Sequence, residues 1–455
     1  MQRKITKIKL DKLFGNFDYE IDLSPPTGKM KILTAPNGFG KSTILKIIHS
    51  FASGNIPFFT RIIYNNITVS LDDGTEIKMI RTPESIDKHN VDIYINNEKI
   101  TTETDPLFVN DKNGNYYLES TYQFLRRLGP EKWVDNRTGE KLNLNQVVAL
   151  YGDYPVPKRR ARVENSIESI VKDLNVRLIP TNRLKIERII PNDRYYSDYD
   201  YLDAPSVSSE VMVDKISLEI KERIQKEIRK QFEDGRKKET TFPGRIIESL
   251  KYKDGPTKDQ IDELLKKVQD IESKYISLGI LPKQNDVNTI SNVFRSSDSD
   301  LGSTEEAGRI VLKTYFEDIL EKFKLLEMLS KQLELFIGSV NSMVFFKKIE
   351  ISSDKGIVAK DLKTGNELYL SLLSSGEQHL IVLLGNLIFN TPEDTLVLVD
   401  EPEISMHLDW QEKFIRTLEN INNLIGFSSL IATHSPNIIG NRWELVIELA
   451  EQTNK

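Results

Sequence analysis

A glycine-rich decapeptide near the start of the chain, TAPNGFGKST at 34–43, restricts the possible folds more than any other stretch of the sequence. It matches the phosphate-binding pattern GxxxxGK[ST], except that Ala35 stands where the pattern has its first glycine. The preceding residues, MKIL, have the pattern of a short buried strand, and the following TILKIIHSF has that of a helix. Because such a loop joins a strand to a helix, these neighbours predict an α/β fold with a phosphate-binding loop.

The chemistry of this loop depends on its backbone and on two side chains. Successive N–H groups at the start of the helix attract anionic phosphate, while Lys41 adds a positive charge and Ser42 a hydroxyl ligand for Mg²⁺. Ala35 is compatible with this role, because Pro36 biases it toward an extended conformation that needs no glycine. We therefore expect ATP and Mg²⁺ as cofactors, with nucleotide contacts from Asn37, Gly38, Phe39, Gly40, Lys41, Ser42 and Thr43.

A second segment, TLVLVDEPE, supplies the acidic groups that hydrolysis needs. It reads as a buried apolar strand that ends in two adjacent carboxylates. We expect Asp400 and Ser42 to hold Mg²⁺, and Glu401 to polarise the water that attacks the γ-phosphate. Glu401 and Lys41 are thus predicted catalytic residues.

A third segment, LLSSGEQHL, contains a helix start that attracts phosphate. Ser374, Ser375 and Gly376 open the predicted helix, and because the chain already has one phosphate loop, this second anion site requires a second nucleotide. The stretch LSSGE from Leu373 to Glu377 resembles the signature of ABC ATPases, LSGGQ. The resemblance implies that two heads pair face to face around ATP, with nucleotide contacts from Ser374, Ser375, Gly376 and Glu377.

Further motifs follow in the order found in ABC ATPases. His434 follows a buried strand in LIATHSP, and by the resemblance it is the switch histidine that contacts the γ-phosphate, the third predicted catalytic residue. His407 and Asp409 correspond to the D-loop region that crosses the dimer seam, so they are candidates for that seam. The segment IPTNRL at 179–184 lies where a glutamine loop is expected but has no glutamine, which leaves that role open.

The pattern of predicted elements divides the chain into three parts. Alternating strands with an Asp73-Gly74 hairpin signal dominate the beginning, and β/α patterns return after Val344. Between them, helices are indicated by a capping box at Thr257 and by an apolar stripe: Val213, Ile216, Ile220, Ile224, Ile228 and Phe232. We therefore predict an ATPase head, with a mixed β lobe and a parallel-sheet core with helices, at 1–205 and 345–455. A helical insertion at 206–344 interrupts it.

Composition excludes several other classes of protein. The chain has 455 residues and no cysteine, which rules out disulfides and thiolate metal sites, and its five histidines are scattered. A net charge of −6 gives no overall basic field for nucleic acid. The N-terminus lacks the apolar core of a signal peptide, and the run LIVLLGNLIF is too short to span a membrane. We expect a soluble cytoplasmic protein without a membrane partner.

The long separation of Lys41 from Ser374 by a helical segment resembles the SMC/RecF/OLD-like branch of ABC ATPases more than a transporter. DEPEISMH…WQ and IPTNRL look like ATPases of bacterial anti-phage operons, most similar to those of PARIS systems and next to Septu systems. OLD nucleases carry a TOPRIM domain after the histidine strand, where only a short tail follows here, and no HNH cluster is visible. The resemblance implies an ATP-sandwiched homodimer, a higher assembly of such dimers, a separate nuclease (TOPRIM-type, or HNH-type if Septu-like) and a phage-encoded trigger.

Two alternatives remain open at this stage. A RecF/Rad50-like DNA-binding ATPase of DNA repair has its best support in the basic run PKRRARV, although such a run more often lies in solvent than docks an effector or follows DNA phosphates. Alternatively, nucleotide only holds subunits together and hydrolysis is vestigial. The intact set of Lys41, Asp400, Glu401 and His434 speaks against the second alternative.

Overall fold

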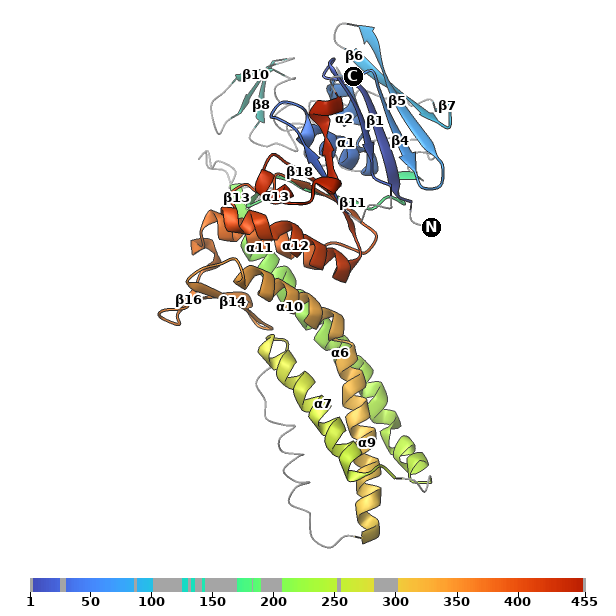
Figure 1. Cartoon of the computed structure of the whole chain (residues 1–455), viewed down its shortest axis with the longest axis vertical. Coiled ribbons are helices and arrows are strands. Elements are labelled where there is room, and N and C mark those ends of the chain that lie inside the picture. The colour runs from blue at the N-terminus through green and yellow to red at the C-terminus, as the bar shows by residue number, and fades with distance from the viewer. Residues whose placement is uncertain are drawn as a thin grey trace, which may run out of the picture. The chain divides into compact units, whose positions relative to one another are not determined.

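The computed structural model describes residues 3–24, 30–85, 88–100, 125–129, 132–135, 141–143, 170–181, 183–189, 207–251, 255–281 and 302–452. The chain forms two compact units (Figure 1). One comprises Met1–Glu210 and Thr391–Lys455, and the other Val211–Asn390. The first unit therefore joins the two ends of the chain, whereas the boundaries that we predicted for the helical insertion stay a prediction.

A parallel sheet forms the centre of the first unit, with the strand order β11-β17-β18-β3-β19. Its strands are β3 (Met30–Thr34), β11 (Val176–Ile179), β17 (Leu396–Asp400), β18 (Ser428–Thr433) and β19 (Val446–Glu448). Apolar runs such as LVLV in β17 suit a strand that is buried on both faces. Because the strands all run in one direction, their carboxyl ends meet at one edge, and the sheet confirms the predicted α/β class.

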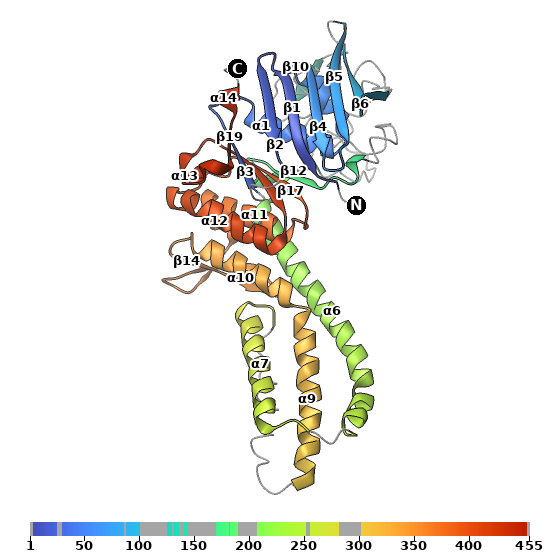
Figure 2. The ribbon, with the colours of Figure 1, turned by 45° about the vertical axis from the view of Figure 1, so that its right-hand side comes forward.

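Six strands form an antiparallel lobe in the order β2-β1-β4-β5-β6-β7 (Figure 2). They are β1 (Ile5–Leu13), β2 (Phe17–Asp22), β4 (Asn66–Leu71), β5 (Glu76–Ser85), β6 (Lys88–Ile95) and β7 (Glu98–Ile100). The predicted hairpin is confirmed: Gly74 has φ +82° in the turn between β4 and β5, a conformation that costs glycine little. One apolar cluster includes Ile8 and Ile67 of the lobe with Leu398 and Leu430 of the parallel sheet, so both share a core.

The described part of the first unit also contains helices and two small sheets. The helices are α1 (Lys41–Ala52), α2 (Ile56–Arg61), α12 (Leu408–Ile425), α13 (Pro436–Ile439), the 3-10 helix Trp443–Leu445 and α14 (Leu449–Gln452). The small sheets consist of β8 (Leu125–Gly129) with β9 (Lys132–Asp135) and β10 (Lys141–Asn143), and of β12 (Lys185–Ile189) with β13 (Val207–Val211). Helix α1 directly follows the phosphate loop and packs on β11, β17 and β18.

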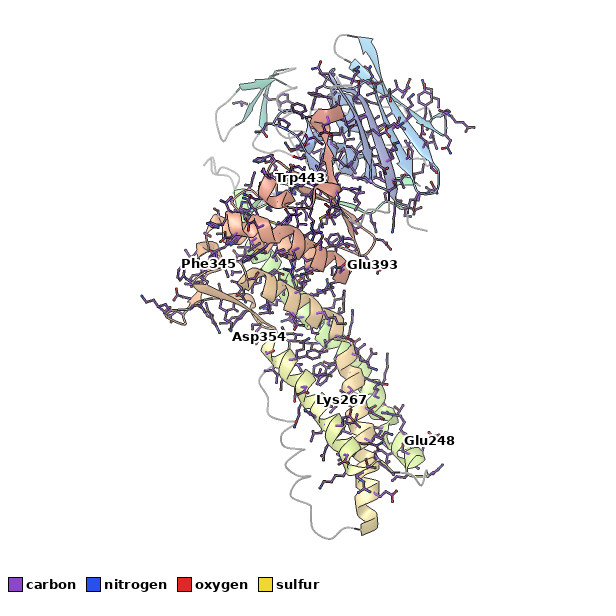
Figure 3. All side chains as sticks on the ribbon, viewed as in Figure 1. Glu248, Lys267, Phe345, Asp354, Glu393 and Trp443 are labelled. Carbon is purple, nitrogen blue, oxygen red and sulfur yellow. The ribbon has the colours of Figure 1, made fainter. Side chains whose placement is uncertain are left out.

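Helices dominate the second unit, where α9 packs against both α6 and α7 (Figure 1). They are α6 (Met212–Ser249), α7 (Lys258–Ser277), α9 (Gly302–Lys324), α10 (Glu327–Asn341), the 3-10 helix Leu370–Leu372 and α11 (Ser375–Phe389). A small antiparallel sheet joins β14 (Lys347–Ser352), β15 (Gly356–Asp361) and β16 (Glu367–Leu368). Asp354 lies in the turn between its first two strands (Figure 3).

The helical predictions for this unit hold for its packed parts. The capping box at Thr257 is confirmed, since the Thr257 hydroxyl accepts from Gln260 N and the Gln260 side chain accepts from Thr257 N. The stripe on α6 is buried at Val213, Ile216, Ile220 and Ile224. The prediction of this stripe was wrong at its far end, where Phe232 is 71% exposed.

Candidate functional site

The phosphate loop lies between β3 and α1 and takes its shape from two glycines. Gly38 and Gly40 have φ of +90° and +86°, which an L-residue adopts only with strain. Gly40 is also the N-cap of α1 and offers no side-chain cap, so the first amides of the helix are left for an anion. Ala35 is absent from the described residues with positive φ, so this position does not need glycine.

Lys41 lies at the first turn of α1 with its side chain buried. Its Nζ donates to the carbonyl oxygens of Ala35 at 2.7 Å and Pro36 at 3.4 Å. Among the described residues, no carboxylate forms an ion pair with it within 4.0 Å. A buried ammonium held only by carbonyls favours an incoming anion, as a phosphate-binding lysine requires.

Asp400 ends β17 and binds two hydroxyl groups, one with each carboxylate oxygen. Ser42 Oγ donates to Oδ1 at 2.9 Å, and Thr181 Oγ1 donates to Oδ2 at 2.9 Å. Thr181 follows β11, the neighbour of β17, so three elements bring these oxygens to one edge of the sheet. Ser42 and Asp400, the two predicted metal ligands, therefore lie together. Thr181 was missed as a member of this cluster, although its segment IPTNRL was noted.

Glu401 follows β17 in a turn where its φ is +43°, a backbone conformation that is costly for any residue other than glycine. Three hydrogen bonds hold this turn: Glu401 N donates to Ala432 O at 2.9 Å, and Arg183 Nη2 donates to the carbonyls of Glu401 and Pro402 at 3.3 and 3.2 Å. Arg183 is 4% exposed, and burial lowers its pKa to about 10, while Glu403 and Asp400 oppose that shift. Sequence reasoning missed Arg183.

His434 follows β18 and lies near two carboxylates. Its Nδ1 is 3.9 Å from Glu401 Oε1 and 3.1 Å from Glu403 Oε1. The structure thus brings together His434 and Glu401, two of the predicted catalytic residues, at the same edge as Asp400. Glu403 was not predicted, although it is the third acidic residue of DEPE.

The two candidates for a dimer seam have a local role in the fold. His407 is the N-cap of α12, and its Nδ1 accepts from Asp409 N at 3.4 Å. Both side chains are exposed. Their assignment to the seam stays a prediction. The basic run at 157–163 and Asn182 lie outside the described residues.

The signature segment belongs to the second unit, where Ser374 caps α11. Ser374 and Glu377 form a capping box, in which Glu377 Oε2 accepts from Ser374 N at 2.8 Å and Glu377 N donates to Ser374 Oγ at 3.3 Å. The buried Glu377 carboxylate also accepts from Lys347 Nζ at 2.7 and 2.9 Å. Burial raises the pKa of Glu377, but the hydrogen bonds from Lys347 and Ser374 outweigh it and hold the pKa below its ordinary value.

The four signature residues differ in their exposure to solvent. Ser374 and Ser375 are exposed at the helix start, whereas Gly376 and Glu377 are buried. The Glu377 carboxylate is occupied by Lys347 and Ser374, so it shapes the turn. Its direct contact with nucleotide stays a prediction.

Comparison with known families identifies the chain. The AAA ATPase domain matches residues 4–439, which is nearly the whole sequence. The chain belongs to this family. The family name agrees with the phosphate loop, the Ser42–Asp400 contact and the Glu401–His434 pair, and it implies ATP and Mg²⁺ as cofactors.

Two curated relatives of this AAA ATPase match only in part. The "Retron Vc95 probable ATPase" of Vibrio cholerae is 25% identical over 207 residues, which are 43% of this chain and 34% of the relative. The "Protein ea59" of Escherichia phage lambda is 32% identical over 92 residues, 20% of this chain and 17% of that protein. The chain thus spans about a third or less of the relatives that it matches.

Solved structures of Smc heads are similar over most of the chain but only loosely. The Smc head of Pyrococcus furiosus bound to the C-terminal domain of ScpA has a TM-score of 0.33 and 12% identity, covering 97% of this chain and 92% of that one. A SmcHead bound to the C-winged helix domain of ScpA has a TM-score of 0.36 and 11% identity, covering 96% and 91%. In the described part of this AAA ATPase, no helix is both long and apolar enough to cross a membrane.

The oxygens around Asp400 suit Mg²⁺. One carboxylate and two hydroxyls are hard donors of the kind that this ion prefers, and phosphate oxygens commonly complete its shell. When bound, Mg²⁺ would neutralise charge that develops on the phosphates. Ser42 and Asp400 would hold it, with Thr181 beside them.

Proposed function

We propose that this AAA ATPase hydrolyses ATP with the residues gathered at the carboxyl edge of its parallel sheet. The observation that carries the proposal is the convergence of the Ser42–Asp400 pair with Glu401 and His434. Lys41 and the loop amides bind the phosphates, and Glu401 accepts a proton from the attacking water. Turnover of ATP by the purified chain, which stops when EDTA removes Mg²⁺, tests this step. An absence of turnover with Mg²⁺ present would contradict the proposed hydrolysis and would favour the alternative in which nucleotide only holds subunits together.

We further propose that two copies bind each nucleotide. Ser374 and Ser375 are exposed at the start of α11. The capping box uses the Ser374 hydroxyl and the amides of Ser374 and Glu377, so the Ser375 hydroxyl and the amides of Ser375 and Gly376 would meet the phosphates bound by another copy. A homodimer of this kind contains two equivalent sites, as symmetry requires. Such dimers would form a higher assembly through surfaces outside the nucleotide site.

We propose that the ATPase serves anti-phage defence as a scaffold and sensor. Support comes from the similarity to a retron ATPase and from the resemblance of DEPEISMH…WQ to ATPases of defence operons. The scaffold would hold a separate nuclease, TOPRIM-type or HNH-type, and release or activate it when a phage-encoded trigger appears. ATP binding would then be required for protection.

Phage challenge of cells that carry the whole operon tests this role. Lys41→Ala should abolish protection, because it removes the phosphate-binding charge, whereas Lys363→Ala, in an exposed turn, should protect like wild type. Purification of the tagged chain from these cells should bring down a nuclease. Protection by Lys41→Ala, or a partner set of replication and repair proteins with salt-dependent DNA binding, would contradict the defence role and favour a repair clamp.

A further inference from the structure

Glu403 is a buried carboxylate beside the site for which the proposed hydrolysis has no use. Its side chain is 5% exposed. Oε1 accepts hydrogen bonds from Thr433 Oγ1 at 2.7 Å and from His434 N at 2.9 Å, and it lies 3.1 Å from His434 Nδ1. Oε2 is buried and has no hydrogen-bond partner among the described residues. A carboxylate that is costly to bury is thus aimed at one imidazole ring.

The short distance to Nδ1 bears on the tautomer of the ring. An ionised carboxylate only accepts hydrogen bonds, so at 3.1 Å it favours the form of the ring in which Nδ1 carries the proton. In the neutral ring Nε2 is then the acceptor, and in the charged ring it is a second donor. Carboxylates that hold the other nitrogen of a functional histidine set its tautomer and orientation in the same way.

The neighbouring Glu401 does not make this contact. Its Oε1 is 3.9 Å from Nδ1, beyond hydrogen-bond distance, so its carboxylate stays available for water. Arg183 binds the carbonyls of Glu401 and Pro402, and it thereby fixes the backbone that joins the two acids. The attraction of Glu403 helps to keep the buried Arg183 charged, so the guanidinium also balances the buried carboxylate.

From this geometry we propose that Glu403 is a positioning residue for His434. It holds Nδ1–H toward its own carboxylate and leaves Nε2 facing the nucleotide. Because Nε2 of the neutral Nδ1–H tautomer is an acceptor, the ring donates to the γ-phosphate from Nε2 only after it takes up a second proton. Glu401 and Glu403 thereby divide two tasks, since one acts on water and the other acts only through the histidine. This role rests on the proposed hydrolysis, but the state of the ring is measurable without it.

Nitrogen NMR of histidine-labelled protein tests the tautomer directly. The chain has five histidines, so the His434→Ala variant identifies the resonances of His434 by their loss. Wild type should show the Nδ1–H tautomer, and Glu403→Ala should lose this preference. Thr433→Val removes another hydrogen bond to the same oxygen and should keep the tautomer, which controls for a merely structural role. An Nε2–H tautomer in wild type, or an unchanged ring in Glu403→Ala, would overturn the proposal.

A double-mutant cycle tests the consequence for turnover. Glu403→Ala should lower kcat by about 10-fold or more while KM for ATP changes little, as for other residues that orient a functional histidine. In the His434→Ala background the same change should have no further effect, because the ring through which it acts is gone. An equal loss of kcat in both backgrounds would show that Glu403 acts independently of His434 and would contradict the proposal.

A second variant separates a folding defect from the effect on His434. Glu403→Asp keeps the charge on a shorter side chain and replaces Glu403→Ala in these experiments if that variant does not fold. Its expected result is a partial loss of kcat with the tautomer retained, and loss of the tautomer with full turnover would count against the proposal. If wild type shows no turnover at all, the proposed hydrolysis fails, whereas the NMR result still decides whether Glu403 sets the ring.

Discussion

Ser42 donates a hydrogen bond of 2.9 Å to Asp400 across a separation of 358 positions in the sequence. The contact exists because β3 and β17 belong to one parallel sheet, with β18 between them. It brings the hydroxyl of the phosphate loop to the acid of the second motif. The same carboxylate binds Thr181 from the next strand, which makes the cluster of oxygens testable by mutation.

Thr181→Val should weaken the affinity for the Mg²⁺ that supports nucleotide binding. Valine has nearly the same shape but no hydroxyl, so Asp400 loses one hydrogen bond and the cluster loses one oxygen. We expect the Mg²⁺ concentration for half-maximal binding of a fluorescent ATP analogue to rise about 10-fold, which corresponds to about 1.4 kcal/mol. Thr181→Ser, which restores the hydroxyl, should recover most of the effect. An unchanged titration with Thr181→Val would exclude Thr181 from the metal site.

Lys41→Ala should strongly weaken binding of ATP while the fold is retained. The side chain contacts carbonyls of its own loop and no described carboxylate, so its loss removes a ligand for phosphate and no ion pair. Isothermal titration should show a Kd weaker by about 100-fold or more, the usual scale for a charge-assisted contact. The control Lys363→Ala should bind like wild type. Binding of wild-type strength by Lys41→Ala would place the nucleotide elsewhere.

Glu401→Gln should lower turnover by about 100-fold or more and leave ATP bound. Glutamine keeps the size of the side chain but cannot accept the proton of water, while Lys41 and the loop amides are unchanged. Radiolabelled nucleotide that stays with the protein through a desalting column measures the trapping. Glu412→Gln, at an exposed site on α12, is the matched control. Normal turnover by Glu401→Gln would assign the proton transfer to another group.

Glu377→Gln should destabilise the protein at neutral pH by about 1–2 kcal/mol, since it removes a charged partner of Lys347 and Ser374. The pKa of Glu377 is held below its ordinary value, so its contribution is present above that value and is lost as pH falls through the folded-state pKa. The difference in Tm between wild type and variant should therefore shrink as pH is lowered. Glu367→Gln, in the exposed pair with Lys355, should change Tm little. A difference that grows toward acid pH would contradict this account.

The motifs could be read from the sequence because each one is local. The phosphate loop is recognised by Gly40, Lys41 and Ser42 in succession, and its two glycines, Gly38 and Gly40, both have positive φ. Likewise, the capping box at Ser374 follows from residues three positions apart. The apolar run of β17 and the acid at its end indicated Asp400, and the structure places it beside Ser42.

Thr181, Arg183 and Glu403 could not be recognised in this way because their partners are distant in sequence. Thr181 is 219 positions from Asp400, and Glu403 is 31 positions from His434. Only the strand order β11-β17-β18 brings these positions together. The prediction that Phe232 extends the buried stripe was wrong for another reason. The helical period continues along α6, but burial depends on a packing partner that the period does not reveal.

Cross-linking between two copies tests the central claim, a nucleotide bound by the loop of one copy and the signature of another. The chain has no cysteine, so single cysteines can be placed without background. Asn37→Cys keeps the loop amides, and Leu372→Cys lies just before the signature and is exposed. Both are combined with Glu401→Gln, mixed and treated with a short bis-maleimide. The account predicts a covalent dimer that needs ATP and Mg²⁺ and vanishes with Ser374→Arg, whereas chains that bind ATP and stay unlinked would contradict it.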